Sequence, residues 1–591
     1  MKKRLLSLLL VGVMASGLLV GCGQEASENK ETAGNTEESV ASKNDEASEE
    51  NSKYPEYLNL DGYRPIVNED EEITLRIAVL RTVGAETIPM EDLWFVKYLN
   101  ENLNINVEWD EWTYDNISER KNLMLTGNDM PDMVWNGSLG GDINQYGVDN
   151  EMFLPISDWV SEELTPNLYE QLSDPSIYDH SKAKDGKVYA VSRKSLERKG
   201  AYSSTPKYRV FIDSKFLNAL GMEEAPDTLD GFVDFLREVK ELDPASMGLE
   251  EIVPYVPRGD KYFITWYLST AFGWAPGSLL NDFIWDETEQ EVVIPYFQEK
   301  YLDYVRLLNT LYTEGLIHED TYTYDPTEAR AHMLNAAVID DDAAFVARPD
   351  DWKDFVLARP LKSEYNNGVA VATTWAPISN GQVIISANTE YPELCLRLMD
   401  YLYSPEGSTY FTYGPEATAD EEIKHGQPGF TVDPSTGVVT IPGVKAEEGV
   451  DNWIHSNICP TMGVVSDPKY YLHTFAGVDE IDFKLNLEDG NDYLNNTLAE
   501  SLKGGQKLTA VMTAPYMTEE QVERYTDLSS LVFNYALTEE TRFIVGDRPI
   551  EELDEFQQEL LDMGGTELLE LKDEIFADYE YVPYDFKYFV D

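Results

Sequence analysis

Positive charge is scarce in this chain of 591 residues. It contains 45 Lys and Arg residues against 109 Asp and Glu residues, which gives a formal net charge of −64 at pH 7. A nucleic-acid partner requires a basic footprint, so that class of function is excluded. Such a charge also repels strongly anionic ligands at long range, although a few arginines in a pocket could override it. Neutral ligands are therefore favoured.

Cysteine and histidine are scarce as well. The three cysteines are Cys22, Cys395 and Cys459, and Cys395 lies in the helical pattern PELCLRLMDYL, where it fits a small core position. In an exported protein Cys395 and Cys459 could form a disulfide, so this pairing stays open. The six histidines lie far apart in the sequence without the spacing of metal ligands: His180, His318, His332, His425, His455 and His473. The sequence therefore predicts no metal and no cofactor.

Only one apolar run approaches membrane length. It extends from Leu5 to Val20, directly after the basic MKKR, and is shorter than the roughly 20 residues that a membrane span needs. This order is typical of a secretory signal. The run ends in LVGC, which resembles the lipobox of bacterial lipoproteins. We therefore expect residues 1–21 to be removed and Cys22 to carry lipid, palmitate included.

A segment that cannot form a core follows the expected lipidation site. Residues 23–53 contain nine Asp or Glu, three Lys and no aromatic residue, so they cannot bury enough apolar surface to offset their ordering entropy. As a flexible coil this tether would span roughly 30 Å. Residues 22–53 are thus expected to hold an exported body at the outer face of the cell membrane.

Strand and helix patterns alternate through the remaining chain. ITLRIAVL has the pattern of a strand, and MEDLWFVKYLNENL has that of a helix. NINVEWDEW (strand), SERKNLMLTG (helix) and PDMVW (strand) continue this order. Alternation of this kind indicates a parallel sheet with helices on its faces, which is an α/β fold. Later helical patterns include PDTLDGFVDFLREVKELDP, with Asp227 or Thr228 as its cap and Pro244 as its stop.

Several of these segments carry a family resemblance through their order and spacing. They are PDMVW, DGKVYAVS, RVFIDSKFLNALG, PDTLDGFVDFLREVKELDP, YVRLLNTLYTEGLIHED, YPELCLRLMDYLYSPEGSTYFTYG, MTEEQVERYTDLSS and RFIVGDRPIEELDEF. With the lipobox, they resemble a family 1 extracellular solute-binding lipoprotein of a carbohydrate ABC transporter of the Gram-positive type.

The resemblance implies a two-lobed, periplasmic-binding-protein-like fold of type II with the ligand in a cleft between the lobes. By analogy, residues 54–207 begin the first lobe and residues 208–378 begin the second. Residues 379–414 return to the first lobe, and residues 415–591 complete the second lobe and a C-terminal helical region. The implied function is a monomeric receptor that binds an oligosaccharide or other small solute and delivers it to the permease subunits of an importer.

Two residues at the end of PDMVW are predicted to contact the ligand. A saccharide site needs aromatic plates for sugar faces and polar groups for hydroxyl edges. Trp135 and Asn136 stand where the short strand meets the loop NGSLGGD, and ligands bind at the carboxyl ends of strands in open α/β sheets. The alternative for Trp135 is packing in the core.

Four further residues are candidates because of their position. Trp274 lies in the turn-rich segment AFGWAPGS, and Trp375 lies in TTWAPISNG before the implied return to the first lobe. Asp342 and Arg348 flank AAFVA, which resembles the segment that lines the cleft of the second lobe. The alternatives are core packing for the tryptophans and solvated charge for Asp342 and Arg348.

One departure from the family concerns calcium. Many relatives carry a loop of the type D-x-D-x-N-G that binds Ca²⁺ through alternating oxygen ligands. The corresponding run here begins at Asp243 and ends at Gly248, but Ala245 and Met247 offer no side-chain oxygen. We predict that this site is lost.

Other functions stay open at this stage. A surface-anchored glycoside hydrolase would need two carboxylates about 5 to 10 Å apart, and a chain so rich in carboxylates can neither reveal nor exclude such a pair. No HExxH, Walker A or G-x-S-x-G motif is present, so we predict that the protein is not an enzyme. A peptide or another non-sugar solute remains an alternative ligand.

Overall fold

The structure is a computed structural model in which residues Met1–Lys53 and Tyr54–Asp591 form two separate units. The described residues are 53–577, 581 and 583–584, with gaps at 83–87, 195–209, 259–260, 278, 324–325, 341–351, 375–377, 445–449, 462, 482–506 and 513–516. The expected signal, Cys22 and nearly all of the tether lie outside them. Among the helices of the described part, none is both long and apolar enough to cross a membrane.

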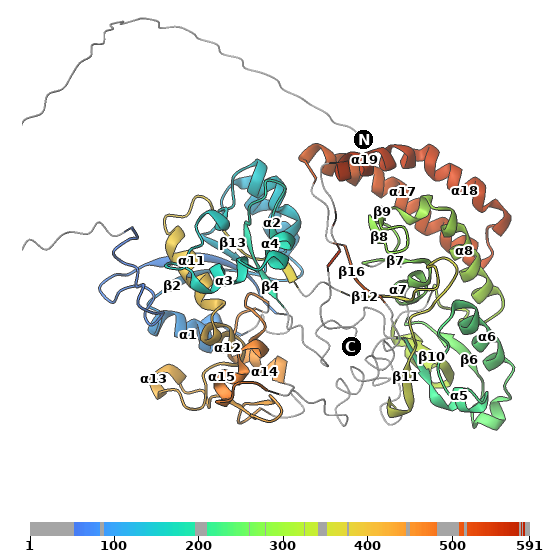
Figure 1. The fold of residues 1–591 in the computed structure, drawn as a ribbon, viewed down its shortest axis with the longest axis horizontal. Coiled ribbons are helices and arrows are strands. Elements are labelled where there is room, and N and C mark those ends of the chain that lie inside the picture. The colour runs from blue at the N-terminus through green and yellow to red at the C-terminus, as the bar shows by residue number, and fades with distance from the viewer. Residues whose placement is uncertain are drawn as a thin grey trace, which may run out of the picture. The chain divides into compact units, whose positions relative to one another are not determined.

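A five-stranded sheet organises the first lobe, which we define by the hydrophobic core around this sheet (Figure 1). Its strand order is β2-β1-β3-β13-β4. The strands are β1 (Thr74–Leu80), β2 (Asn106–Trp112), β3 (Met133–Trp135), β4 (Ala190–Lys194) and β13 (Ile378–Ile385). Strands β1, β2 and β3 are mutually parallel, whereas β13 runs antiparallel to β3 and β4. The strand and helix alternation in the sequence is thereby confirmed.

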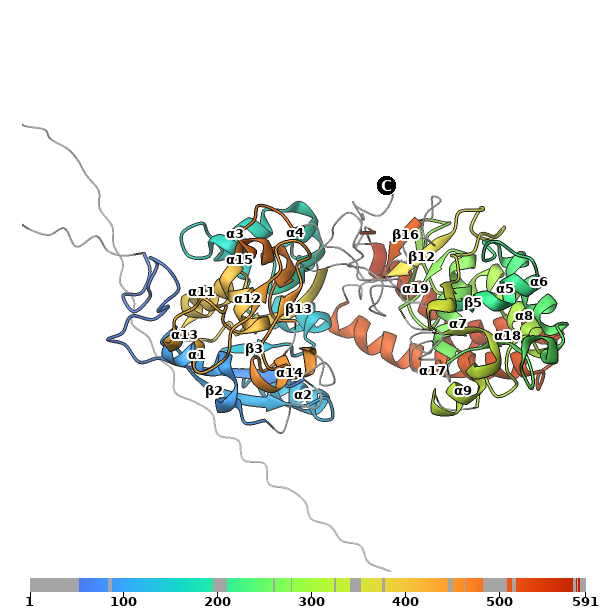
Figure 2. The same cartoon turned by 90° about the horizontal axis from the view of Figure 1, so that it is seen from below.

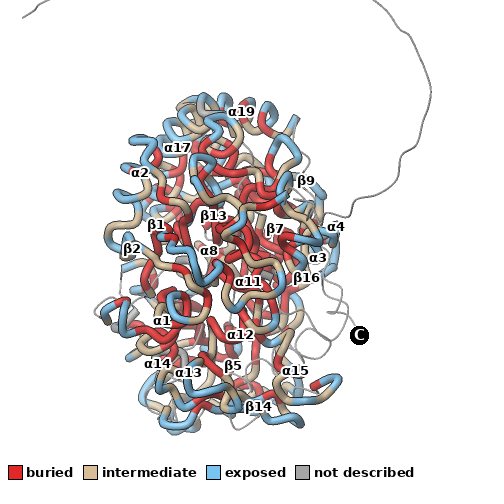
Figure 3. The backbone as a smooth tube through the Cα atoms, turned by 90° about the vertical axis from the view of Figure 1, so that its left-hand side faces the viewer, coloured by how far each residue is buried: buried red, intermediate tan, exposed pale blue. Residues whose placement is uncertain are grey.

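Alternate residues of β1 enter two different cores. Leu75, Ile77 and Val79 belong to one cluster of buried side chains, and Ala78 and Leu80 belong to the other. This is the period of two that a strand buried on both faces requires. The first face is covered by α1 (Trp94–Glu101), α11 (Pro392–Leu402) and α12 (Pro405–Tyr413), and the second by α2 (Ile117–Gly127) and η3 (Ile143–Asp149). Residues 394–402 of α11 are all buried (Figure 3).

The second lobe has its own core, built mainly from residues 210–361 and 532–575. Its main sheet has the order β11-β5-β10-β6, in which β10 is parallel to β6 and antiparallel to β5. These strands are β5 (Val210–Asp213), β6 (Val253–Val256), β10 (Ala336–Asp340) and β11 (Phe355–Leu357). Smaller sheets comprise β7 (Trp274–Ala275), β8 (Ile284–Asp286) and β9 (Glu291–Val293), and β12 (Val371–Thr374) with β16 (Lys507–Ala510).

Capping residues set the ends of two helices of the second lobe. Helix α6 (Leu229–Lys240) is capped by Thr228, whose side chain accepts a hydrogen bond from the Gly231 amide at 3.2 Å. Helix α17 (Glu519–Val545) starts with a capping box between Thr518 and Gln521 and ends at Gly546 in the left-handed conformation. Figure 2 shows α17 as the long helix of this lobe. Further helices of this lobe are α5 (Ser214–Ala219), α7 (Lys261–Leu268), α8 (Glu299–Thr313), α9 (Pro326–His332), α18 (Leu553–Leu560) and α19 (Thr566–Ala577).

A buried arginine links α17 to α18. The Arg548 guanidinium contacts Glu539 at 2.8 Å, Glu552 at 3.1 Å and Glu559 at 3.0 Å, and the Arg548 and Glu539 side chains are both less than a tenth exposed. The hydrogen bond from Arg548 lowers the pKa of the Glu559 carboxyl below its ordinary value. Of the three carboxylates only Glu539 is buried, and Arg548 supplies it with a counter-charge in addition to that of Arg542, which contacts it at 2.8 Å.

One expected lobe boundary differs from the observed packing. We expected residues 415–591 in the second lobe, but Phe430, Ile454 and Val465 pack in the core of the first lobe. The physical reason is hydrophobic: these side chains are buried against the face of the sheet that α1, α11 and α12 cover. Among the described residues after Val465, β16 is the first segment to pair with a strand of the second lobe.

Candidate functional site

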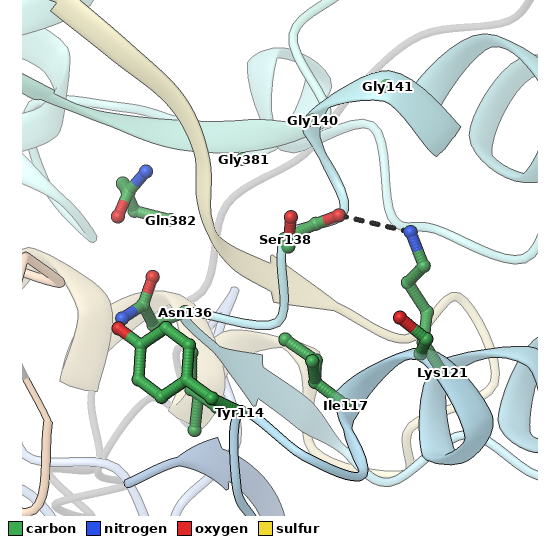
Figure 4. A pocket seen from close by; sticks show the side chains of 11 residues that line it. Tyr114, Ile117, Lys121, Asn136, Ser138, Gly140, Gly141, Gly381 and Gln382 are labelled. Atoms are coloured by element: carbon green, nitrogen blue, oxygen red, sulfur yellow. Dashed lines mark hydrogen bonds between the residues drawn. The ribbon is translucent and has the colours of Figure 1, made fainter. Parts of the chain in front are cut away.

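A cavity of about 490 Å³ opens at the carboxyl ends of the three parallel strands of the first lobe (Figure 4). Strand β1 lies between β2 and β3, so the chain reverses its direction across the sheet between β1 and β3. Ligands bind at this kind of position in open α/β sheets. The lining residues are Leu80, Tyr114, Ile117, Ser118, Lys121, Asn136, Ser138, Gly140, Gly141, Gly381 and Gln382.

Glycines shape one wall of this cavity. Gly381 has a φ of +76°, and a Cβ placed on it would lie 2.6 Å from both Cα and N of Gly140. The irregular part of β13, between Ser379 and Val383, therefore approaches the loop after β3 more closely than any side chain would permit. The backbone amide of Asn136 donates to the carbonyl of Gln382 at 2.7 Å, which fixes the same approach.

The cavity is lined by polar groups without a strong net charge. The Asn136 side-chain amide donates to Thr461 Oγ1 at 3.2 Å, and Thr461 is fully buried. Lys121 Nζ donates to the Ser138 carbonyl at 3.3 Å, the bond drawn in Figure 4, and pairs with Asp142 at 2.8 Å. The cation is thus already neutralised. Amides, hydroxyls and backbone groups of this kind suit a ligand with uncharged hydroxyl edges.

Tyr114 supplies an aromatic face at the rim of the cavity. Its side chain is 57% exposed, and it stands two residues beyond the end of β2. Tyr114 is not among the residues predicted from the sequence, although the rule that pointed to Asn136 applies equally to the residues after β2. If the residues after the carboxyl end of every parallel strand had been considered, Tyr114 would have been predicted as well.

Comparison with known proteins supports a fold and no closer relationship. No family model matches the chain and no curated protein matches it. Among solved structures, an extracellular solute-binding protein from Bifidobacterium longum subsp. infantis matches with a TM-score of 0.67 and 18% identity, over 87% of this chain and 100% of that one.

Two further matching structures are of proteins whose descriptions name a sugar. The S. pneumoniae ABC-transporter substrate-binding protein FusA, solved in complex with kestose, matches with a TM-score of 0.61 and 17% identity over 86% of this chain and 99% of its own. The alginate-binding protein AlgQ2, solved without calcium ion, matches with a TM-score of 0.53 and 17% identity, over 86% of this chain and 98% of that one. The chain has the solute-binding-protein fold. The two-lobed α/β architecture predicted from the sequence is confirmed.

Within this solute-binding-protein fold, Trp135 is packed in the core and not at the cavity. It is fully buried, with its ring 5.5 Å from that of Trp109 and 6.1 Å from that of Phe411. Trp135 aligns with Val79 in the sheet, so its side chain enters the core on the face opposite to Leu80, which lines the cavity. The packing supports the core alternative, whereas Asn136, one residue on, does line the cavity.

Trp274 also has a core environment. It is fully buried in the second lobe, its ring stacks on Phe272 at 5.5 Å, and its Nε1 donates to Gln298 Oε1 at 2.5 Å. The Lys300 ammonium lies 5.3 Å from the Trp274 ring centroid. The turn-rich sequence placed this residue correctly outside a long helix, but turns in a large lobe can be buried. Trp375, Asp342 and Arg348 lie outside the described residues.

The expected calcium loop has a structural role in this chain. The Asp243 carboxylate accepts a hydrogen bond from the Ala245 amide at 3.1 Å and thereby caps the short helix η5 (Pro244–Met247). Gly248 closes this helix with a φ of +71°. The loss of the calcium site stays a prediction.

Both remaining cysteines are free thiols. Cys395 and Cys459 are buried and unpaired by any disulfide, so the open alternative of a bridge does not hold. Burial raises the pKa of the Cys459 thiol to about 12 and raises that of Cys395 further. Neither thiol is therefore poised for nucleophilic chemistry at neutral pH.

Proposed function

We propose that this protein is an extracellular receptor that binds a carbohydrate, an oligosaccharide in particular, and delivers it to the permease of an ABC importer. The observation that carries the proposal is the match of the fold over 86% of the chain to a substrate-binding protein that holds kestose. The cavity supports it independently, since an exposed aromatic face beside uncharged polar groups is what a sugar ring requires.

The N-terminal sequence supports the location of this receptor. A signal in residues 1–21, a lipid on Cys22 and a polar tether would hold the two lobes at the outer face of the membrane, next to a permease. We propose that the first lobe comprises residues 54–194 and 378–481 and the second lobe residues 210–374 and 507–577, and that the receptor is monomeric. Metabolic labelling with palmitate should mark the full chain and leave the Cys22→Ser variant unlabelled.

Titration calorimetry tests the ligand class. The form Gly23–Asp591 retains the whole compact unit Tyr54–Asp591. It would be titrated with neutral oligosaccharides, uronate oligosaccharides and short peptides. Saturable binding of one neutral oligosaccharide per chain supports the proposal. Heat from peptides alone would assign a different solute.

The same samples separate a receptor from an enzyme. A receptor releases its ligand intact, so mass spectrometry of the oligosaccharide after incubation should show no shorter product. Cleavage of the bound oligosaccharide, or turnover of a chromogenic glycoside, would instead support a surface-anchored glycoside hydrolase.

A further inference from the structure

Two histidines that are remote in the sequence meet in the second lobe. The rings of His318 and His332 lie 3.9 Å apart between centroids, with their planes inclined by 37°. Asp320 stands beside them, and the potential ligand atoms of all three residues lie within 4.8 Å of one another. From their spacing in the sequence, the histidines were interpreted as separate. That interpretation was wrong for this pair, because folding brings together two residues that are separated by 13 others in the sequence.

Backbone contacts hold the first half of this cluster on the main sheet. The His318 amide donates to the Tyr255 carbonyl at 3.1 Å, next to the bridge between Tyr255 and Ile317. The Asp320 amide donates to His318 Nδ1 at 3.1 Å, and the Thr321 hydroxyl donates to the His318 carbonyl at 2.6 Å. The position of His318 is therefore fixed by its contact with β6, and Asp320 follows in the adjoining turn.

His332, the other imidazole of the cluster, is held by its position at the end of a helix. His332 is the last residue of α9, and the next residue, Met333, is fully buried and begins the short turn that enters β10. Strands β6 and β10 are neighbours in the sheet. His318 thus follows a backbone bridge to β6, and His332 ends the helix that leads into β10, so neighbouring parts of the sheet support both imidazoles, as a metal or ligand site needs.

Space for an ion is present at the cluster. A cavity of about 450 Å³ is lined by Asp320, Thr323, Glu328, Ala331 and His332. Asp320 is exposed, whereas the two histidines are half-buried. An ion could therefore enter from solvent and keep a water or the Glu328 carboxylate as a further ligand.

We propose that His318, Asp320 and His332 form a binding site for a transition-metal cation, with Zn²⁺ as the test ion. Two imidazoles and one carboxylate are ligands typical of Zn²⁺, whereas Ca²⁺ and Mg²⁺ prefer oxygen ligands alone. Zn²⁺ holds nitrogen and oxygen ligands at about 2.0–2.2 Å. The three donors must therefore move together by roughly 1 Å, which half-buried and exposed side chains permit. If the ion occupies Nε2 of His318, Nδ1 takes the proton and gives up the Asp320 amide.

Such a site would tie the segment after α8 to the end of α9. Its consequence is a metal-dependent stability of the second lobe, separate from the carbohydrate cavity of the first lobe. An ion that binds only the folded chain stabilises it by mass action. The proposal thus stands or falls without reference to sugar binding.

Calorimetric titration of ZnCl₂ into the untagged form Gly23–Asp591, after treatment with a chelator, tests the site. We expect one saturable site per chain above the weak background of the many surface carboxylates. His318→Gln and His332→Gln should each weaken this site by about 100-fold or more, since loss of an outer-shell partner alone weakens metal binding about 10–100-fold. His473→Gln, a histidine outside the cluster, should leave it unchanged.

Further measurements keep the outcome decisive. Asp320→Asn retains both imidazoles and should weaken binding less than either histidine variant, and each variant must melt like the parent chain without metal. Co²⁺ should give a visible d–d absorption that the histidine variants lack. Absence of a stoichiometric Zn²⁺ site, equal Zn²⁺ binding in all variants, or displacement of Zn²⁺ by Ca²⁺ at equal concentration would overturn the proposal.

Discussion

Replacement of Tyr114 by alanine should weaken oligosaccharide binding about tenfold. A tyrosine side chain has about 200 Å² of surface, so the 57% exposed here amounts to roughly 110 Å². A sugar ring that stacks on one face covers about half of this, roughly 55 Å². At about 25 cal/mol per Å² the contact contributes about 1.4 kcal/mol, which is a factor of about ten in Kd.

The assay is titration calorimetry with the oligosaccharide that the ligand panel selects. Tyr114→Phe retains the ring and should bind within about twofold of the parent chain if stacking supplies the contact. Tyr169→Ala is the matched control, because Tyr169 is also exposed, at 41%, but lies on helix α3 (Pro166–Leu172) and does not line the cavity. Its binding should equal that of the parent chain.

Two results would refute the reasoning about Tyr114. Unchanged affinity in Tyr114→Ala would mean that the ligand does not use this face, and the cavity would lose its role as the sugar site. An equal loss in Tyr169→Ala would show that the effect comes from a general change in the lobe. A melting temperature within a degree or so of the parent chain is required before either result is interpreted.

Three further predictions follow from backbone and ion-pair geometry. Gly381→Ala should destabilise the chain by about 1 kcal/mol for its positive φ and by about 1–3 kcal/mol more for the clash with backbone. Gly368→Ala, with a φ of +73° and no atom within 4 Å of its Cβ, should show only the first effect in thermal melts. Arg548→Met should destabilise the chain by about 2 kcal/mol in chemical denaturation, because it removes one of the two arginines that pair with the buried Glu539 carboxylate, whereas Arg524→Met at a solvent-accessible pair should have a much smaller effect. Because Arg548 lowers the pKa of Glu559, their pairing contributes fully above the ordinary value of 4.5. The stability gap between parent and Arg548→Met should therefore shrink as the pH falls below that value, and a gap that widens in acid would contradict the assignment.

Local patterns in the sequence were sufficient to predict several of the individual elements. The helix over PDTLDGFVDFLREVKELDP begins at Thr228, one of the two caps expected, and ends at Lys240, before the proline stop. The signal was strong because apolar spacing, a cap and a stop agree in one segment. The strand ITLRIAVL was predicted from its alternating apolar pattern, and PDMVW from its short apolar run.

Long-range packing was harder to predict. Phe430, Ile454 and Val465 carry no sign in their own segments of which sheet will cover them, and so the final crossing between the lobes was placed too early. Trp135 shows the same limitation on a smaller scale. Its position at a strand end was correct, but the face that its side chain enters depends on the register of β3 against β1, which sequence position alone does not specify.

The charge of the ligand is decided by the cavity and not by the fold. The solved structures with this fold include an alginate-binding protein and a protein in complex with kestose, so the fold by itself does not specify the ligand. Among the described residues that line the cavity, Lys121 is the only cation, and Asp142 pairs with it at 2.8 Å. A uronate would have to compete with Asp142 for that ammonium, inside a chain whose formal net charge is −64. At physiological ionic strength charges farther than about 8 Å are largely screened, so this local competition outweighs the distant charges. A neutral oligosaccharide meets no such penalty, and its affinity should therefore change little between low and high salt.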